Sequence, residues 1–380
     1  LEAAESGDRA SKIVSSLKHE KFMDAFAFII HPLSAKRDVA RKYPLLGRML
    51  PEPVIDFASR FWPPVYISHV TGVRSAATGK EIEGWLIAVP YTVQRMLQLP
   101  PTEVYRKIIA AGRMAERLGA QILGLGAYTS VVGDGGVTIA RALDLAVTSG
   151  DSYTAALAIR ATREAVRRME YDPAAVTLAV VGAAGAIGSI VTQSLAREFG
   201  SVLLVGRELR HLEPLGERLR AGGAPEVRLS TEVADIQQAE VVITVTSAGG
   251  NLVRPEHLRR GAVVCDVSRP RDVSWQVAQA RDDVLVFDGG LAEVPGAVDF
   301  GFDYGLPPTL TFGCMAETMT LALEGRFEDY SLGKDLTLEQ MEDIDAVAEK
   351  HGFRLAALRS FEQVLPDATI ARVKAQARAT

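Results

Sequence analysis

The chain has 380 residues, of which 48% are hydrophobic and 23% charged, and its net charge at pH 7 is −5. This composition is typical of a globular protein with more than one domain, and the lack of a lysine- or arginine-rich block argues against nucleic acid as a partner. No apolar run approaches the roughly 20 residues that span a bilayer. The two cysteines are too few for a disulfide framework, and the six histidines lack metal-ligand spacing, so we expect a cytoplasmic protein without a metal site.

The N-terminal region predicts strands separated by an apolar segment. Residues 1–12 are polar and lack the apolar core of a signal peptide, so we expect a loose terminus there. Runs rich in aromatic and β-branched residues predict strands over 21–31, 64–73 and 81–91. The proline-punctuated stretch 43–64 is either core or the wall of an apolar pocket, and we favour core because apolar side chains are mostly buried.

Two helices are predicted next. The first spans 101–121, with Thr102 as its N-cap and Gly119 as its C-terminal stop. A strand that begins at residue 122 then runs into a glycine-rich loop ending at 136. The second helix spans about 152–170, with Asp151 or Ser149 as its cap and with its arginines facing water.

Short apolar runs then alternate with helical or polar stretches. Six strands are predicted, over 176–181, 201–206, 226–230, 240–247, 262–268 and 284–289. Apolar runs of this length are typical of strands buried on both faces, and the alternation predicts an α/β fold with a Rossmann-type doubly wound parallel sheet. Residues from about 310 onward predict helices again.

The stretch VVGAAGAIGSI, residues 180–190, predicts a phosphate-binding loop between the first of these strands and a helix. Gly182 permits the sharp turn out of the strand, Gly185 lets the backbone approach a pyrophosphate, and Gly188 lets the helix pack closely on the strand. The helix N-terminus offers free N–H groups to the anion. The alternative is a glycine turn that binds no ligand. We predict dinucleotide binding by the loop residues Gly182, Ala184, Gly185, Ala186, Ile187 and Gly188.

Two further segments extend this prediction. Arg207 stands nineteen positions after Gly188, where NAD sites usually have an acidic residue, and Arg210 follows closely. Because arginine pairs with a 2′-phosphate, we predict NADP(H) rather than NAD, with Glu208 pointing away. After the fourth strand, the small residues of TSAGG lie at the edge of the sheet where ligands bind. The cofactor-binding candidates there are Thr246, Ser247 and Ala248.

The two cysteines differ in their sequence surroundings. Cys265 lies inside a predicted buried strand, so we assign it to packing. Cys314 lies at the start of a predicted helix, where a thiol pKa is lowered, and a thiolate is a nucleophile for acyl groups. The sequence pattern alone leaves a nucleophile and a small core residue equally open for Cys314.

Six segments resemble the long-chain acyl-[acyl-carrier-protein] reductases, which form aldehydes. They are LGAYTSVV (125–132), TSGDSYTAALAIRATREA (148–165), VVGAAGAIGS (180–189), DGGLAEV (288–294), FGCMAETMTLALEG (312–325) and MEDIDAVAEKHGF (341–353). The cysteine segment matches the family at many positions, and in that family the cysteine carries the acyl thioester. Residues 1–100 match poorly. A weaker likeness links VVCDVSRPRDV (263–273) to glutamyl-tRNA reductase.

The resemblance implies an NADPH-dependent reduction of a fatty acyl thioester to an aldehyde through an acyl group on Cys314. The donor of the acyl group is then acyl carrier protein or coenzyme A, and a lipid substrate suggests a peripheral contact with a membrane. Oxyanion donors are expected from main-chain N–H groups near Cys314 or from the hydroxyl of Ser130. The expected domains are an acyl-binding region (1–150), a connecting helix (151–172), an NADP-binding domain (173–305) and a helical segment with Cys314 (306–380).

Two other interpretations stay open. One is a plain NADP-dependent dehydrogenase of a hydroxy or amino acid, with a shikimate-dehydrogenase-like fold, which needs an acid–base pair instead of a cysteine. The other is a dinucleotide-binding module without catalysis. Blocking Cys314 separates the first from the acyl-thioester reductase, and product analysis separates the second.

Overall fold

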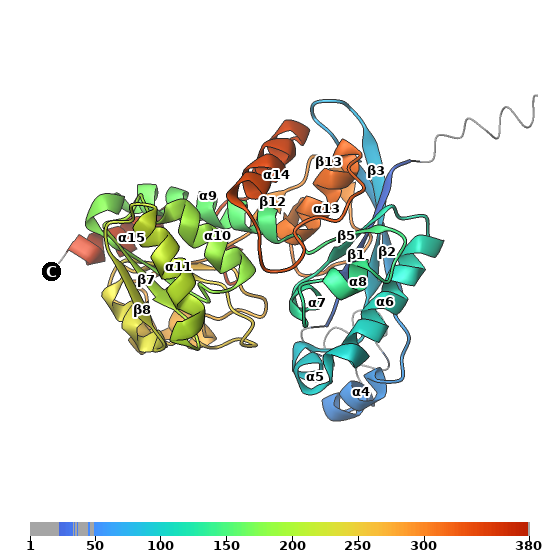
Figure 1. Cartoon of the computed structure of the whole chain (residues 1–380), viewed down its shortest axis with the longest axis horizontal. Helices are drawn as coiled ribbons and strands as arrows, with labels where there is room; N and C mark the ends of the chain where they lie inside the picture. Colours follow the sequence, from blue (N-terminus) through green and yellow to red (C-terminus); the bar gives the residue numbers. More distant parts are fainter. Residues whose placement is uncertain (1–22, 33, 35, 37–44, 46–48, 379–380) are drawn as a thin grey trace, which may run out of the picture.

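The computed structural model describes residues 23–378 apart from 33, 35, 37–44 and 46–48, so the expectation for residues 1–12 lies outside the described residues. The described chain forms two six-stranded sheets with helices between and around them (Figure 1). The predicted α/β class with a Rossmann-type sheet is confirmed. None of the described helices is long and apolar enough to cross a membrane.

The first sheet is mixed and has the strand order β13-β2-β3-β1-β4-β5. Its strands are β1 (Ala25–Ile30), β2 (Val65–Arg74), β3 (Glu81–Ala88), β4 (Ile122–Leu125), β5 (Ala146–Thr148) and β13 (Gly296–Asp299). Strand β1 runs parallel to β3 and β4, whereas β2 runs antiparallel to β3. Strand β13 pairs with β2, so the chain returns to the first sheet before residue 305, the predicted end of the NADP-binding domain.

The second sheet is parallel throughout and has the order β11-β10-β9-β6-β7-β8. Its strands are β6 (Thr177–Val181), β7 (Ser201–Val205), β8 (Val227–Ser230), β9 (Val241–Thr244), β10 (Val263–Asp266) and β11 (Leu285–Asp288). All six lie within the predicted runs. The order reverses between β6 and β9, which is the position where open α/β sheets bind ligands.

The helices cover both sheets. They are α4 (Glu52–Ser59), α5 (Val93–Gln98), α6 (Pro101–Arg117), α7 (Tyr128–Val131), α8 (Val137–Ala140), α9 (Asp151–Met169), α10 (Ala186–Leu195), α11 (Leu209–Ala221), α12 (Trp275–Ala280), α13 (Gly313–Glu324), α14 (Leu338–His351) and α15 (Asp367–Arg378). The N-cap of α6 is Pro100 with Pro101 in the first turn, so the predicted Thr102 cap is wrong. Proline suits this position because the first helical N–H groups have no partner within the helix.

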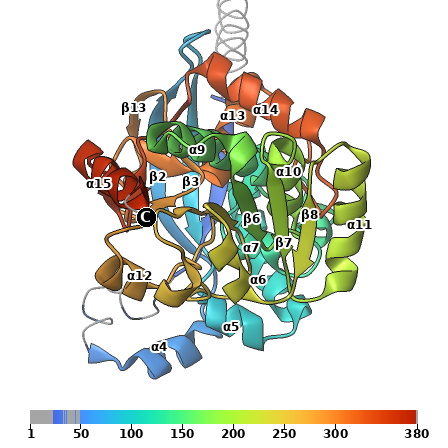
Figure 2. The same ribbon diagram turned by 90° about the vertical axis from the view of Figure 1, so that its left-hand side faces the viewer.

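Helix α9 packs against α10, α13 and α14, and all four lie in the upper part of Figure 2. Its N-cap is Gly150 in a left-handed conformation, so the predicted N-cap position is wrong, although the Ser149 hydroxyl accepts the N–H of Asp151 at 3.4 Å. Arg163 and Arg167 face water as predicted, but Arg160 is partly buried and pairs with Asp345 at 2.7 Å. The helix is buried on most of its sides because it serves as core for both sheets.

The last seventy residues divide between the sheets. Strand β14 (Leu310–Phe312) pairs with β12 (Leu291–Glu293), which also pairs with β15 (Arg354–Leu355). Helix α13 packs against β1 and β4 of the first sheet, whereas α15 packs against α9 and β11 of the second. A two-stranded sheet joins β16 (Arg359–Ser360) and β17 (Gln363–Val364). The segment expected to be helical therefore also contains short strands.

Candidate active site

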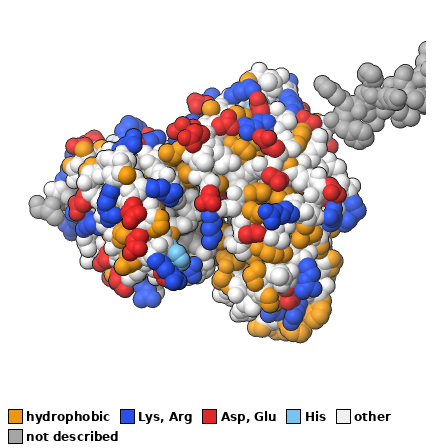
Figure 3. Space-filling view, viewed as in Figure 1, with side chains coloured by type: hydrophobic (Ala, Val, Ile, Leu, Met, Phe, Trp, Pro, Cys, Tyr) orange, Lys and Arg blue, Asp and Glu red, His pale blue; other side chains and the backbone are white. Residues whose placement is uncertain are grey.

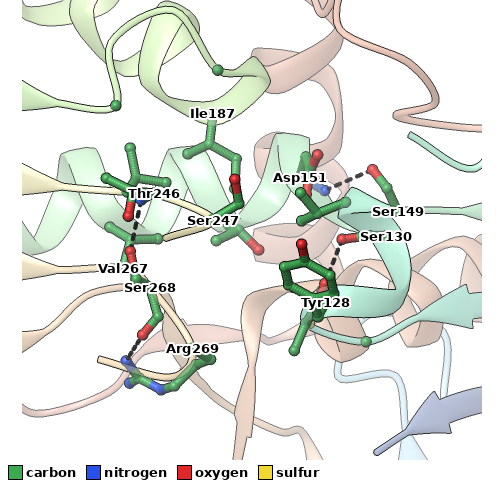
Figure 4. Close-up of a pocket in the computed structure, with 18 of the residues that line it drawn as sticks. Tyr128, Ser130, Ser149, Asp151, Ile187, Thr246, Ser247, Val267, Ser268 and Arg269 are labelled. Carbon is green, nitrogen blue, oxygen red and sulfur yellow. Dashed lines mark hydrogen bonds between the residues drawn. The ribbon is translucent and has the colours of Figure 1, made fainter. Parts of the chain in front are cut away.

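A cleft of about 1240 Å³ lies between the two sheets, and the hollow is visible in the space-filling view (Figure 3). Residues of both sheets line it, and Figure 4 shows Tyr128, Ser130 and Asp151 facing Ile187 and Ser247 across it. Every residue predicted to act in the site lines this cleft. These are Ser130, Gly182, Ala184, Gly185, Ala186, Ile187, Gly188, Arg207, Arg210, Thr246, Ser247, Ala248 and Cys314.

The glycine loop between β6 and α10 is shaped as a cradle. Gly182 has a φ of +86°, and a Cβ there would overlap the carbonyl of Val245. A Cβ on Gly188 would overlap the carbonyl of Gly182, so the helix lies directly on the turn. Gly185 is exposed in the cleft, where an added Cβ would have Gly182 alone as a neighbour within 4 Å. The loop therefore leaves room for a pyrophosphate at the start of α10, which fits a dinucleotide.

Charged side chains stand at the end of β7, beside the cradle. Arg207, Glu208 and Arg210 are exposed and all three line the cleft. Glu208 pairs with Arg210 at 2.5 Å, so the expectation that Glu208 points away is wrong. Because the ion pair occupies Arg210, Arg207 is the better candidate for a 2′-phosphate. The positive charge of Arg207 also acts on the hydroxyl of Tyr128 from the opposite side of the cleft.

Asp272 fixes the loop that follows β9. This carboxylate is fully buried and accepts hydrogen bonds from the hydroxyls of Thr244 at 2.6 Å, Thr246 at 2.7 Å and Ser268 at 2.5 Å. The backbone N–H of Thr246 also donates to Asp272 and to Ser268. Thr246 and Ser247 are thereby held at the edge of the sheet. Sequence reasoning missed Asp272, whose partners lie at the end of β9 and in the loops after β9 and β10.

Cys314 lies at the first turn of α13, where α13 meets the start of α9. A Cβ on Gly150 would overlap the backbone of Cys314, and a Cβ on Gly313 would come within 2.8 Å of the Cα of Thr154. The two helix starts therefore contact each other through glycine backbone. Cys314 is partly buried and lines the cleft, whereas Cys265 is fully buried on β10, as predicted.

The ionisation of Cys314 differs from the prediction. Burial raises the pKa of the Cys314 thiol to about 12, and the charges of Asp151 and Glu317 add to that rise. The prediction of a lowered pKa at a helix start is wrong, because desolvation of the thiolate outweighs the effect of the helix end. Hydrogen bonds from the backbone N–H groups of Ala127 and Met315 act in the opposite direction. These two amides converge on the sulfur from different elements.

Ser130 belongs to the short helix α7 that begins beside this sulfur. Its hydroxyl donates to the carbonyl of Ala127 at 2.8 Å, so its proton is already used within the turn. Ala127 has a φ of +47°, a strained conformation for a residue with a side chain. The Ala127 N–H stabilises the thiolate form of Cys314, so the main-chain alternative for the oxyanion donor fits better than Ser130.

Two carboxyl groups that sequence reasoning missed stand next to Cys314. Burial, followed by the charge of Glu317, raises the pKa of Asp151 to about 8, and Asp151 lines the cleft. Glu317 is fully buried one turn beyond Cys314. Both residues lie inside segments quoted for the family resemblance, but their closeness depends on the contact between α9 and α13.

The wall of the cleft on the side of the first sheet is apolar. It includes Ile30, Trp62, Ile67, Phe302 and Phe312. The interpretation of 43–64 as core is wrong for most of its described part. In α4 and the turn after it, the exposed fractions of Val54, Phe57 and Phe61 are 47%, 60% and 72%, and hydrophobic side chains gather in that part of the surface (Figure 3). Trp62 lines the cleft, as the pocket-wall alternative predicted.

Comparisons with known proteins find similarity to a dehydrogenase family model, to an acyl reductase and to an aminotransferase. The family model for shikimate / quinate 5-dehydrogenase matches residues 163–288, about a third of the chain. The long-chain acyl-[acyl-carrier-protein] reductase of Synechococcus elongatus is 27% identical over 86% of this chain and 96% of its own length. Aminotransferase PigE of a Serratia species is 32% identical over 88% of this chain, and this chain spans 40% of its length.

Solved structures match with low scores. The 5-ketofructose reductase of a Gluconobacter species covers 85% of this chain with 11% identity and a TM-score of 0.35, and 99% of that protein is covered. A dipicolinate synthase chain of Bacillus halodurans covers 50% of this chain with 14% identity and a TM-score of 0.32, and 62% of that protein is covered. These scores carry no conclusion about the reaction.

Proposed function

We propose that the protein is an NADPH-dependent oxidoreductase that reduces a long-chain acyl thioester to an aldehyde through an acyl group on Cys314. The observation that supports this most is that Cys314 and the glycine cradle line one cleft with an apolar wall. The match to the acyl-[acyl-carrier-protein] reductase over most of both chains supports the same reaction.

The first half of the proposed reaction is acyl transfer. The Cys314 sulfur attacks the thioester carbonyl, and its proton passes to the carrier sulfur as that sulfur departs, while Asp151 keeps its own proton. The backbone N–H groups of Ala127 and Met315 stabilise the negative charge on the carbonyl oxygen. The bond to the carrier sulfur breaks as the carrier sulfur takes up the proton of the Cys314 thiol. The products are an acyl thioester on Cys314 and a free carrier thiol.

The second half is reduction. The bound nicotinamide cofactor supplies the hydride, and the residues that would hold it are those of the 182–188 loop, Arg207 and the Thr246–Ala248 loop. When the reduced acyl group leaves as an aldehyde, the sulfur takes the proton of Asp151, and Asp151 regains a proton from solvent before the next turnover. The sum consumes one hydride and one proton per thioester. The apolar wall excludes water, which would otherwise hydrolyse the acyl group to an acid.

The carrier is acyl carrier protein or coenzyme A in this proposal. The peripheral contact with a membrane stays a prediction, and the exposed apolar face of α4 beside Trp62 supports it. The match to an aminotransferase is compatible, because more than half of that protein lies outside the match and an aldehyde is a substrate class that transamination converts to an amine.

The decisive experiment is mass spectrometry of the protein after incubation with a long-chain acyl thioester in the absence of NADPH. We expect a mass increase of one acyl group on the peptide that contains Cys314, and none in a Cys314→Ser variant. A Cys265→Ser variant is the matched control and should be acylated as the unmodified protein is. Unmodified Cys314 in a protein that still oxidises NADPH would overturn the covalent scheme.

A plain dehydrogenase of a hydroxy or amino acid remains the second candidate. The shikimate / quinate 5-dehydrogenase match supports it, and a lysine, Lys334, and an acid, Asp151, both line the cleft. Alkylation of Cys314 distinguishes the two candidates. Activity of a plain dehydrogenase would survive alkylation of Cys314 and fall in a Lys334→Met variant, whereas acyl reduction would be lost on alkylation.

A further inference from the structure

The start of helix α9 lacks a capping side chain of its own. Its N-cap residue is Gly150, although the first turn of a helix leaves N–H groups that need acceptors. Buried N–H groups without a partner cost free energy, so an acceptor from another element is expected. The hydroxyls of Ser149 and Ser331 accept the N–H groups of Asp151 and Ser152, and helix α13 supplies the acceptor for the next N–H.

Glu317 fills this position. Its carboxylate accepts the backbone N–H of Tyr153 at 2.8 Å and the hydroxyl of Thr148 at 2.5 Å. The Thr148 oxygen in turn accepts the backbone N–H of Gly150 at 3.1 Å. Glu317 thus binds the first turn of α9 both directly and through Thr148, although it lies 164 residues from Tyr153 in sequence.

The hydrogen-bond pattern around Glu317 favours its ionised form. Both partners donate to its oxygens, and a carboxyl group that only accepts is ionised. A negative charge also suits the positive end of the α9 dipole. Burial raises the pKa of Glu317, and the hydrogen bonds from Thr148 and Tyr153 oppose that rise. A buried carboxylate beside the reactive thiol therefore has more than a packing role.

We propose that Glu317 is the positioning residue of this site: its carboxylate holds the first turn of α9 against α13, so that the Asp151 carboxyl and the Cys314 thiol stay adjacent under its negative charge. The consequence of this arrangement for the reaction rests on the proposed function, whereas the contacts of Glu317 do not depend on that function. The charge keeps the proton on Asp151, the group that must supply protons during reduction, and it restrains ionisation of Cys314 until a substrate is attacked.

Other titratable groups surround this arrangement. They are Tyr304, which senses the charge of Cys314, Tyr330, which senses that of Glu317, and Tyr128 and Lys334, which line the cleft. Substitution of Glu317 leaves each of them in place. A change in the ionisation of Cys314 on substitution of Glu317 can thus be assigned to the lost carboxylate.

The test is the pH dependence of alkylation of Cys314 by iodoacetamide, followed by mass spectrometry of its peptide, in the full chain. In Glu317→Gln we expect the midpoint of thiol ionisation to fall by about one unit and the alkylation rate at pH 8 to rise about 10-fold, because one negative charge is removed. Glu317→Asp keeps the charge and should keep the midpoint within a few tenths of a unit. A merely structural role would loosen the site in both variants and shift both midpoints.

Glu324→Gln is the matched control, since Glu324 lies at the other end of α13 and pairs with Lys350 and His351. It should leave the midpoint unchanged. An unchanged or raised midpoint in folded Glu317→Gln, or equal shifts in the Gln and Asp variants, would overturn the proposal. Alkylation needs no acyl substrate, so these outcomes are independent of the mass-spectrometric test of acyl reduction.

If Glu317→Gln fails to fold, Thr148→Val replaces it. That variant removes the link from Gly150 to the carboxylate and leaves the charge, so we expect the midpoint to stay and the rate of acyl transfer to fall. A midpoint that falls as far as predicted for Glu317→Gln would contradict the role of the charge.

Discussion

The two cysteines of this chain have similar ionisation and different surroundings. Burial raises the pKa of both Cys265 and Cys314 to about 12. Cys265 is fully buried on β10, and an added Cβ on Gly289 would come within 2.6 Å of its sulfur. Cys314 lines a cleft, receives two backbone N–H groups and has two carboxyl groups beside it. A shifted pKa alone therefore does not identify a nucleophile, whereas access to a cleft and neighbouring hydrogen-bond donors do.

The largest expected effect comes from the sulfur of Cys314. In Cys314→Ser we expect NADPH oxidation with a long-chain acyl thioester to fall by about 1,000-fold or more, because the acyl-enzyme can no longer form at a useful rate. NADPH binding, measured by fluorescence titration, should stay within about twofold. Retention of turnover would mean that the two cysteines do not differ in function.

A substitution at Gly150 tests whether the reactivity of Cys314, which Cys265 lacks, depends on the contact of α9 with α13. Gly150→Ala should lower acyl transfer by about 100-fold, because the new Cβ meets the Cys314 backbone and misplaces the thiol. Gly119→Ala is the matched control: Gly119 also has a positive φ, of +86°, but nothing lies within 4 Å of an added Cβ. Both variants carry about 1 kcal/mol of backbone strain. Equal activity loss in the two would point to strain, not to the contact.

Asp151 makes the proposed reduction at Cys314 depend on pH. Its pKa of about 8 predicts that reduction declines as pH rises through about 8, because the proton donor is lost. In Asp151→Asn we expect that decline to disappear and kcat below pH 7 to fall by about 10- to 100-fold. The profile of kcat between pH 6 and 10 decides, and an unchanged alkaline decline in the variant would assign it to another group.

The same group predicts a pH effect on stability. A carboxyl whose pKa is raised on folding binds more protons in the folded state than in the unfolded one between about pH 4 and 8, so its contribution to stability is lost as pH rises across that window. The melting temperature of Asp151→Asn should therefore fall less between pH 6 and 9 than that of the unmodified protein. Calorimetry at both pH values measures the difference.

The smallest effect is expected at Cys265. Cys265→Ala removes a buried sulfur from a packed strand and should lower the free energy of unfolding by about 1–2 kcal/mol. Activity should remain within about twofold, since this sulfur lies outside the lining of the cleft. Chemical denaturation measures the first quantity and steady-state kinetics the second. A larger loss of activity than of stability would give Cys265 a role beyond packing.

Local sequence patterns predicted the second sheet well. Each of its six strands is a short apolar run, and the glycine loop follows the first of them, so strand periodicity and spacing were sufficient. The cap of α9 could not be predicted in this way. Glu317, which accepts the N–H of Tyr153, comes from a distant helix, whereas the sequence pattern indicated the neighbouring residues Ser149 and Asp151.

The prediction of a lowered pKa for Cys314 failed for a related reason. A helix start is visible in sequence, but the burial that raises this thiol's pKa arises from Gly150, Gly313 and the first sheet meeting at one point. Likewise, Glu208 pairs with Arg210 within the cleft, and the exposed face of α4 contradicts an apolar stretch taken as core. Desolvation and pairing are tertiary quantities, and composition does not report them.

The path of the chain has a practical consequence for dissecting this protein. Strand β13 closes the edge of the first sheet after the second sheet is complete, and α15 returns to pack on β11 and α9. A fragment cut at residues 173 and 305 would lose α9 and α15, and would expose to water the parts of β10 and β11 that these helices cover. Truncation is therefore a poor way to isolate nucleotide binding, and point substitutions in the intact polypeptide are the sound alternative.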